Sequence, residues 1–157
     1  VLFELLRENK NLRLKIVGVL ELDQKFDQVQ EQIEKVGFVD WKKLPELIAS
    51  VDINLMPLED TLFHRSKSEN KWMEAALVGV PTVASYNSEI ANHTLNHEDI
   101  ILCKNDIEWR EALKQLISDH ELYSAISQTA LKNVMEEKTT LRNNEILVKQ
   151  MLEETIG

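Results

Sequence analysis

The polar residues that could take part in chemistry are concentrated between residues 56 and 86. This stretch starts at the end of an apolar run, continues as a polar loop, and enters a helical pattern near residue 70. Backbone N–H groups at the start of a helix, hydroxyl groups and a lysine are groups that can hold a diphosphate. The loop and the first helical turn supply them through Ser66, Lys67, Ser68, Asn70 and Lys71.

One turn into the same helical pattern stands an acidic residue, Glu74. A carboxylate at this place could accept hydrogen bonds from both hydroxyl groups of a ribose, as acidic residues do in other nucleotide-binding folds. The same residues fit a purely structural role equally well, in which the polar side chains cap the helix and Glu74 complements its dipole. The residue types alone leave both interpretations open.

Two histidines, His93 and His97, are four residues apart, a spacing with which a helix can present two ligands to zinc. No third ligand is evident nearby and the surrounding residues are polar, so we expect no metal site. The single cysteine, Cys103, excludes an intrachain disulfide, and we expect it to be a small buried apolar residue.

The elements that must position these residues alternate between short apolar runs and longer helical patterns. Two predicted helix starts have the form of a capping box, Asn105 with Glu108 and Ser118 with Glu121. The predicted strands are residues 12–17, 36–39, 53–56, 80–85 and 100–103. After a helix in the first ten residues, predicted helices start near residues 22, 44, 70, 105, 118 and 140.

This alternation predicts an α/β fold, a Rossmann-like doubly wound parallel sheet with helices on both faces. Short, mostly apolar and β-branched strands are typical of a sheet that is buried on both faces. In such sheets ligands bind outside the carboxyl ends of the strands, which is where the polar loop after residue 56 is expected to lie.

Length and composition indicate one domain of 157 residues. The net charge of -9, from 27 acidic and 18 basic residues, argues against nucleic acid as a partner. No run of apolar residues is long enough to cross a membrane, and we expect a cytoplasmic location. The sequence begins at Val1 inside a predicted helix, so we expect it to be part of a longer protein.

Residues 71–85, KWMEAALVGVPTVAS, resemble a known family signature: glutamate-alanine, then glycine-x-proline, then valine-alanine-serine. It is the signature of retaining GT-B glycosyltransferases of family 4, the group 1 type. Four further segments resemble the same family in order and spacing, namely residues 14–18, 36–39, 44–57 and 109–119. The resemblance is to the C-terminal, donor-binding domain of these enzymes.

The resemblance implies a role for individual residues. Glu74 matches the family glutamate that binds the ribose of the donor, while Asn70 and Lys71 lie near its diphosphate. The backbone of Val39 matches a contact to the base, and Gly18 matches the glycine after the first strand of the core. Ser66 stands where the family has a second glutamate, which approaches the donor sugar. The catalytic residues stay unassigned.

The resemblance also implies partners and a reaction. The donor would be a nucleotide diphosphate sugar, with UDP or GDP, and no metal or other cofactor would be required. Sugar transfer would need a separate N-terminal acceptor-binding domain, against which a last helix at about residues 140–156 could pack. The full-length enzyme could associate peripherally with a membrane. Two alternatives stay open: a non-catalytic binding module, which Ser66 favours, and a sugar-nucleotide epimerase of the same architecture.

Overall fold

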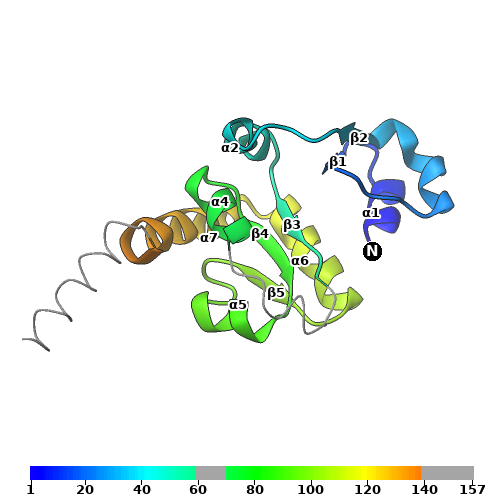
Figure 1. Ribbon diagram of the computed structural model, residues 1–157. Coiled ribbons are helices and arrows are strands. Elements are labelled where there is room, and N and C mark those ends of the chain that lie inside the picture. Colours follow the sequence, from blue (N-terminus) through cyan, green and yellow to red (C-terminus); the bar gives the residue numbers. More distant parts are fainter. Residues whose placement is uncertain (59–69, 139–157) are drawn as a thin grey trace, which may run out of the picture.

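A computed structural model of the chain describes residues 1–58 and 70–138 (Figure 1). The strands are β1 (Leu14–Val17), β2 (Ile33–Val36), β3 (Asn54–Met56), β4 (Thr82–Ser85) and β5 (Ile101–Cys103). The α-helices are α1 (Leu2–Glu8), α2 (Leu44–Ala49), α4 (Asn70–Leu77), α5 (Ser88–His93), α6 (Asp106–Ser118) and α7 (His120–Asn133). Three further helical segments are η1 (Gln24–Gln32), η2 (Trp41–Lys43) and η3 (Val134–Lys138).

Every strand pair in the described residues is parallel, which confirms the predicted α/β class. The strands form two sheets, one of β1 and β2 and one in the order β3-β4-β5. In the first sheet Leu14 is opposite Ile33, and in the second Val83 is opposite both Leu55 and Ile101. In Figure 1, α2 lies along the chain between the two sheets.

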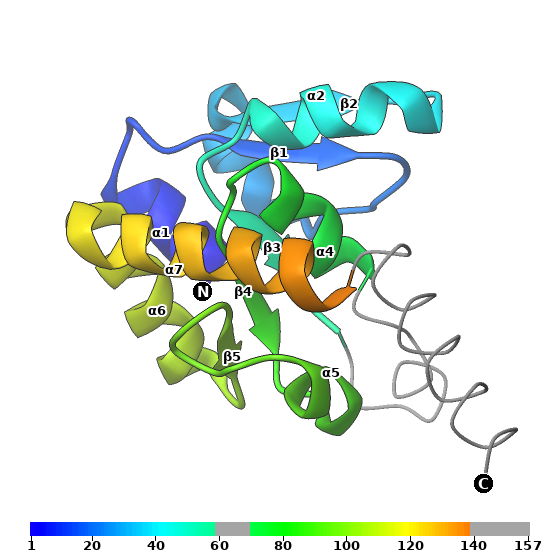
Figure 2. The ribbon, with the colours of Figure 1, turned by 90° about the vertical axis from the view of Figure 1, so that its left-hand side faces the viewer.

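Helices cover both faces of the three-stranded sheet, as predicted (Figure 2). Successive residues of a strand point to opposite faces, so the neighbours Ala84 and Val83 belong to different apolar clusters. On the face of Ala84 the cluster includes Trp72 of α4, Ile90 of α5 and Ala130 of α7. On the face of Val83 it includes residues of α1, α6 and α7.

The two-stranded sheet has a smaller core of its own. Phe3 and Leu6 of α1 pack with Val29 of η1, and Phe26 meets the ring of Phe3 edge-on. Helix α1 also packs on the other sheet, because Leu5 belongs to the cluster around Val83. A single short helix therefore contacts the cores of both sheets.

The second strand differs from its prediction. Residues 36–39 were expected to form it, but β2 ends at Val36 and Phe38 is 87% exposed. The strand begins at Ile33, inside the stretch predicted as a helix from residue 22, of which residues 24–32 are a 3-10 helix. Glu34 and Lys35 occupy the middle of the strand and are exposed, so its apolar character is confined to its two ends.

Candidate functional site

Helix α4 connects two neighbouring parallel strands, β3 and β4. A helix in such a connection runs antiparallel to the strands, and the chain reaches it from their carboxyl edge. Asn70 and Lys71 begin this helix. The side-chain amide of Asn54, on β3, donates to the carbonyl of Lys71 at 3.4 Å and holds this turn near the sheet.

The two sides of α4 have different environments. Trp72, Ala75 and Ala76 are at most 1% exposed, and the indole N–H of Trp72 donates to the carbonyl of Asp99 at 2.9 Å. Asn70, Lys71 and Glu74 are all exposed. These three residues fall at positions i, i+1 and i+4 of the helix and share its outer side, so their side chains are available to a ligand.

The loop before α4 contains Ser66, Lys67 and Ser68, which lie outside the described residues. Their predicted contact with a diphosphate stays a prediction. The structure shows how the two described ends of this loop are fixed. At one end the hydroxyl of Ser85, the last residue of β4, accepts a hydrogen bond from the backbone N–H of Leu58 at 3.1 Å. At the other end the first turn of α4 is held by Asn54.

Gly18 directly follows β1, and Val39 follows β2 three residues after its end. The N–H of Gly18 donates to the carbonyl of Val36 at 2.9 Å, and its φ of +95° lies in a region that favours glycine. A Cβ added to Gly18 would lie 3.9 Å from the ring of Phe38, while Val39 is half-buried. Gly18 therefore holds the turn after β1 in a backbone conformation that other residues rarely adopt.

The predicted site residues thus form two groups on different sheets. Asn70, Lys71 and Glu74 follow the three-stranded sheet, whereas Gly18 and Val39 follow the two-stranded sheet. Sequence reasoning missed another pair at the carboxyl edge, Tyr86 after β4 and Lys104 after β5, whose Nζ lies 4.8 Å from the centre of the tyrosine ring. Their position directly after two apolar runs is the signal that could have identified them.

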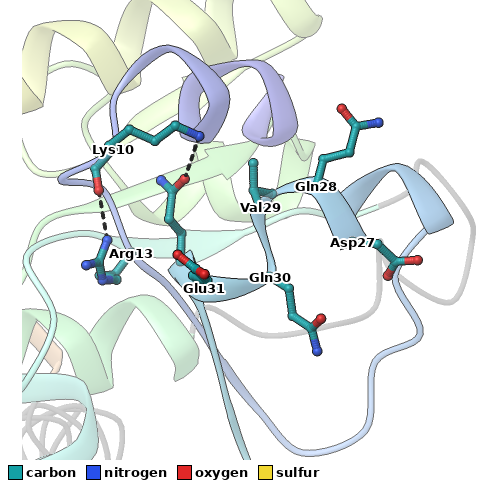
Figure 3. A pocket seen from close by; sticks show the side chains of 8 residues that line it. Lys10, Arg13, Asp27, Gln28, Val29, Gln30 and Glu31 are labelled. Carbon is teal, nitrogen blue, oxygen red and sulfur yellow. Dashed lines mark hydrogen bonds between the residues drawn. The ribbon is translucent and has the colours of Figure 1, made fainter.

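A surface cavity of about 470 Å³ lies elsewhere, at the amino ends of β1 and β2 (Figure 3). Its lining residues are Lys10, Arg13 and residues 27–32, none of which was predicted to bind a ligand. The polar groups here serve the fold: Arg13 donates to the carbonyls of Lys10 and Leu12, and Lys10 donates to the side chain of Gln32. This cavity is at the end of the strands opposite to the candidate site.

Within residues 1–58 and 70–138, no group of three or more histidine, cysteine, aspartate or glutamate side chains is placed to hold a metal ion. Cys103 is buried, as expected, and is a free cysteine. Burial raises the pKa of its thiol to about 11. The thiol is therefore protonated at neutral pH and is a poor nucleophile.

A parallel α/β sheet with helices on both faces defines the doubly wound class of domain. Residues 2–119 match the family model described as glycosyl transferases group 1, so the chain belongs to this family. The family predicted from residues 71–85 and the four accompanying segments is thereby confirmed.

Solved structures confirm the fold as one half of a GT-B glycosyltransferase. Anabaena HepE in complex with UDP has a TM-score of 0.74 and 16% identity, and the match covers 97% of this chain and 44% of HepE. HepE with UDP and glucose gives a TM-score of 0.77 at 15% identity over the same shares. The C-terminal domain of LpcC from Francisella tularensis, a glycosyl transferase group 1 family protein, gives a TM-score of 0.70 at 19% identity. This match covers 88% of this chain and 75% of the LpcC domain.

The chain spans less than half the length of HepE. No curated protein matches it. Among the described helices, none has the length and apolar character needed to cross a membrane.

Proposed function

We propose that this chain binds the nucleotide diphosphate sugar of a glycosyltransferase reaction. Glu74 would accept hydrogen bonds from the ribose, residues 66–71 would surround the diphosphate, and the base would contact the backbone of Val39. The observation that supports this is the exposed position of Glu74, one turn into the helix that connects two neighbouring parallel strands, β3 and β4. Membership of the glycosyl transferase group 1 family agrees with it.

The nucleotide we propose is a uridine nucleotide. The solved structures of HepE hold UDP, UDP with glucose, and UDP-glucose, and their fold matches this chain over 97% of its length. The positive end of the α4 helix dipole, together with the charge of Lys71, would stabilise the departing diphosphate. Transfer would therefore need no metal ion. The acceptor would be held by a further domain, because the chain corresponds to 44% of HepE.

Calorimetric titration with UDP, GDP and ADP, each with and without magnesium, tests the binding proposal. We expect UDP to bind with the same affinity in both conditions, and Glu74→Ala to weaken it about tenfold or more, since two hydrogen bonds to a charged group are lost. Glu111→Ala is the matched control, because Glu111 is also an exposed glutamate on a helix and has no predicted role. Equal affinity of both variants for UDP would contradict the role of Glu74.

The reaction is tested by incubating the full-length protein with a UDP-sugar and a set of hydroxyl-bearing acceptors, and by analysing the products. A glycoside with retained configuration is the expected product. Free isomerised sugar would instead indicate an epimerase. Nucleotide binding without any turnover would indicate a binding module, the alternative that Ser66 favours.

A further inference from the structure

Tyr86 and Lys104 are the first residues after β4 and β5, two neighbouring parallel strands. The backbone N–H of Tyr86 donates to the carbonyl of Cys103 at 2.7 Å, so the pairing of these strands continues one residue beyond Ser85. The Nζ of Lys104 lies 4.8 Å from the centre of the tyrosine ring. The two side chains therefore lie together at the carboxyl edge of the three-stranded sheet.

Both side chains are open to solvent, since Tyr86 is 45% exposed and Lys104 is exposed as well. The neighbouring carboxylate of Glu108 already accepts from the backbone N–H of Lys104 at 2.7 Å and from the side chain of Asn105 at 2.9 Å. None of the ion pairs among the described residues includes Lys104. Its ammonium group therefore keeps a positive charge and N–H donors that a ligand can use.

The backbone on each side of the pair is fixed by regular structure. Tyr86 lies between the end of β4 and Asn87, the N-cap of α5, and Lys104 lies between the end of β5 and Asn105, the N-cap of α6. A site built on the ends of strands and the starts of helices needs little ordering when a ligand binds. The pair is thus held in place before any ligand arrives.

An exposed aromatic ring beside an ammonium group suits one class of ligand in particular. The face of a tyrosine ring attracts the C–H groups of a sugar ring, and its negative quadrupole favours their weakly positive hydrogens. An ammonium group binds a carboxylate through charge-assisted hydrogen bonds. A sugar ring that carries a carboxylate presents both features on one ring, whereas a neutral sugar would leave the charge of Lys104 unused.

The position of the pair along the edge agrees with a sugar subsite. In the proposed site the base lies at Val39, after β2, and the polar loop for the diphosphate follows β3. Both views show the two-stranded sheet on the β3 side of the other sheet (Figures 1 and 2). Leu58, at the start of the polar loop, donates to the hydroxyl of Ser85, and Tyr86 is the next residue. Because neighbouring strands are about 4.8 Å apart, the pair lies only one or two strand spacings beyond the loop, on the side away from the base.

We propose that Tyr86 and Lys104 form a subsite for a sugar ring that bears a carboxylate. Tyr86 stacks on the ring, and Lys104 donates to the carboxylate. This inference rests on the proposed binding of a nucleotide diphosphate sugar and adds the class of sugar. The order of groups along the edge assigns the acidic sugar to the donor; an acidic sugar of the acceptor has the same chemistry, and the experiment distinguishes the two sources.

Calorimetric titration with UDP-glucuronate and UDP-glucose tests the subsite, because the two ligands differ only in a carboxylate at the sugar. We expect UDP-glucuronate to bind about tenfold or more tightly, the gain from a hydrogen bond to a charged group. Lys104→Met removes the charge and should abolish this preference. Lys132→Met, at an exposed lysine of α7, is the matched control and should keep it. Tyr86→Leu should weaken both UDP-sugars, and Tyr86→Phe, which keeps the ring, should restore their binding.

An oligosaccharide that contains glucuronic acid, titrated without nucleotide, tests the acceptor as the source of the acidic sugar. Binding that Lys104→Met weakens and Lys132→Met does not would support the subsite and assign it to the acceptor. The same affinities in wild type and Lys104→Met for every ligand, or equal losses in both lysine variants, would overturn the subsite. Failure of UDP itself to bind would contradict the proposed function instead, and the oligosaccharide titration would still decide whether the subsite exists.

Discussion

The two sheets of this chain are built on the same parallel plan but are stabilised differently. In the three-stranded sheet, β4 and β5 carry residues such as Val83 and Leu102 that are at most 4% exposed, and helices cover both faces. In the two-stranded sheet only Ile16, of eight strand residues, is buried. Apolar packing therefore stabilises the first sheet, while the second depends more on polar contacts and on α1.

The largest expected effect comes from removing the main side chain of the three-stranded core. Trp72→Ala should lower the free energy of unfolding by about 3–5 kcal/mol, because it leaves a large cavity and an unpaired carbonyl at Asp99. Denaturant unfolding measures this change. Trp41→Ala is the control, since Trp41 is 76% exposed and precedes α2, and it should change stability by less than about 0.5 kcal/mol. Similar losses in the free energy of unfolding for both variants would contradict the conclusion that apolar packing stabilises the three-stranded sheet.

The two-stranded region should depend on a buried polar residue, Gln32, which is 4% exposed. Its side-chain N–H₂ donates to the carbonyls of Leu6, Asn9 and Leu12 at 2.9–3.1 Å, and so ties α1 and the turn after it to η1. Gln32→Ala should cost about 1–3 kcal/mol, the range for leaving buried acceptors unpaired.

Hydrogen exchange can locate the effect of Gln32→Ala. We expect the amides of β1 and β2 to exchange faster, with β4 and β5 little changed, because the two regions have separate cores. Gln28→Ala, at an exposed residue of the same segment, should have almost no effect. Uniformly faster exchange throughout the chain would show instead that both sheets unfold as one unit.

The difference in burial between the two sheets explains which strands the sequence predicts. Residues 80–85 and 100–103 are identified as strands because sheets buried on both faces need continuous apolar runs. Strand β2 is not, because Glu34 and Lys35 are exposed on its open faces. The helix predicted from residue 22 includes Ile33, which the structure places in β2, and α5 has no counterpart among the predicted elements.

Capping shows where local sequence rules succeed and fail. Asn105 accepts from the N–H groups of Ile107 and Glu108, so the first predicted cap is confirmed. The second is wrong, because Asp119 caps α7 by accepting from Leu122, while the hydroxyl of Ser118 donates back to the carbonyl of Lys114. The two neighbours compete for the position, and sequence alone did not decide between them.

For the candidate site, Trp72, Ala75 and Ala76 mark the buried side of α4, which leaves Glu74 exposed. The sequence could not predict that Gly18 and Val39 follow a different sheet, since that depends on strand pairing. The roles of Glu74 and the polar loop stay predictions, which nucleotide titration tests.

A smaller, pH-dependent effect should come from Asp99, a buried polar residue of the three-stranded region. Its carboxylate accepts from the N–H of Leu95 at 2.7 Å and from the side chain of Asn133 at 2.9 Å, at the end of α7. Burial raises the pKa of this carboxyl above its ordinary value of 3.8, although both hydrogen bonds oppose the shift.

A pKa raised by folding gives a contribution to stability that is complete below the unfolded-state pKa and is lost as pH rises through the folded-state pKa. We therefore expect wild-type protein to lose stability relative to Asp99→Asn as pH increases above about 4. Urea unfolding over a pH series measures the difference. Asp106→Asn, at an exposed aspartate, is the control, and a wild-type advantage that grows with pH would contradict the sign.

The smallest expected effect concerns the ion pair that links the two regions. Arg110 of α6 donates to both carboxylate oxygens of Glu8 at the end of α1, and Lys114 lies 3.6 Å away. The Arg110 guanidinium lowers the pKa of Glu8 below its ordinary value of 4.5, so its contribution is present above that pH and is lost as pH falls.

Because these side chains are exposed, Glu8→Gln should lower the thermal midpoint only slightly, and less at high salt. Glu4→Gln is the control, since Glu4 pairs with Arg7 inside α1 and does not reach α6. Hydrogen exchange distinguishes the two variants: Glu8→Gln alone should loosen α1 from α6 and expose the amides of β1 and β2. Equal exchange in both variants would mean that apolar packing of Leu5, and not the ion pair, keeps α1 on both cores.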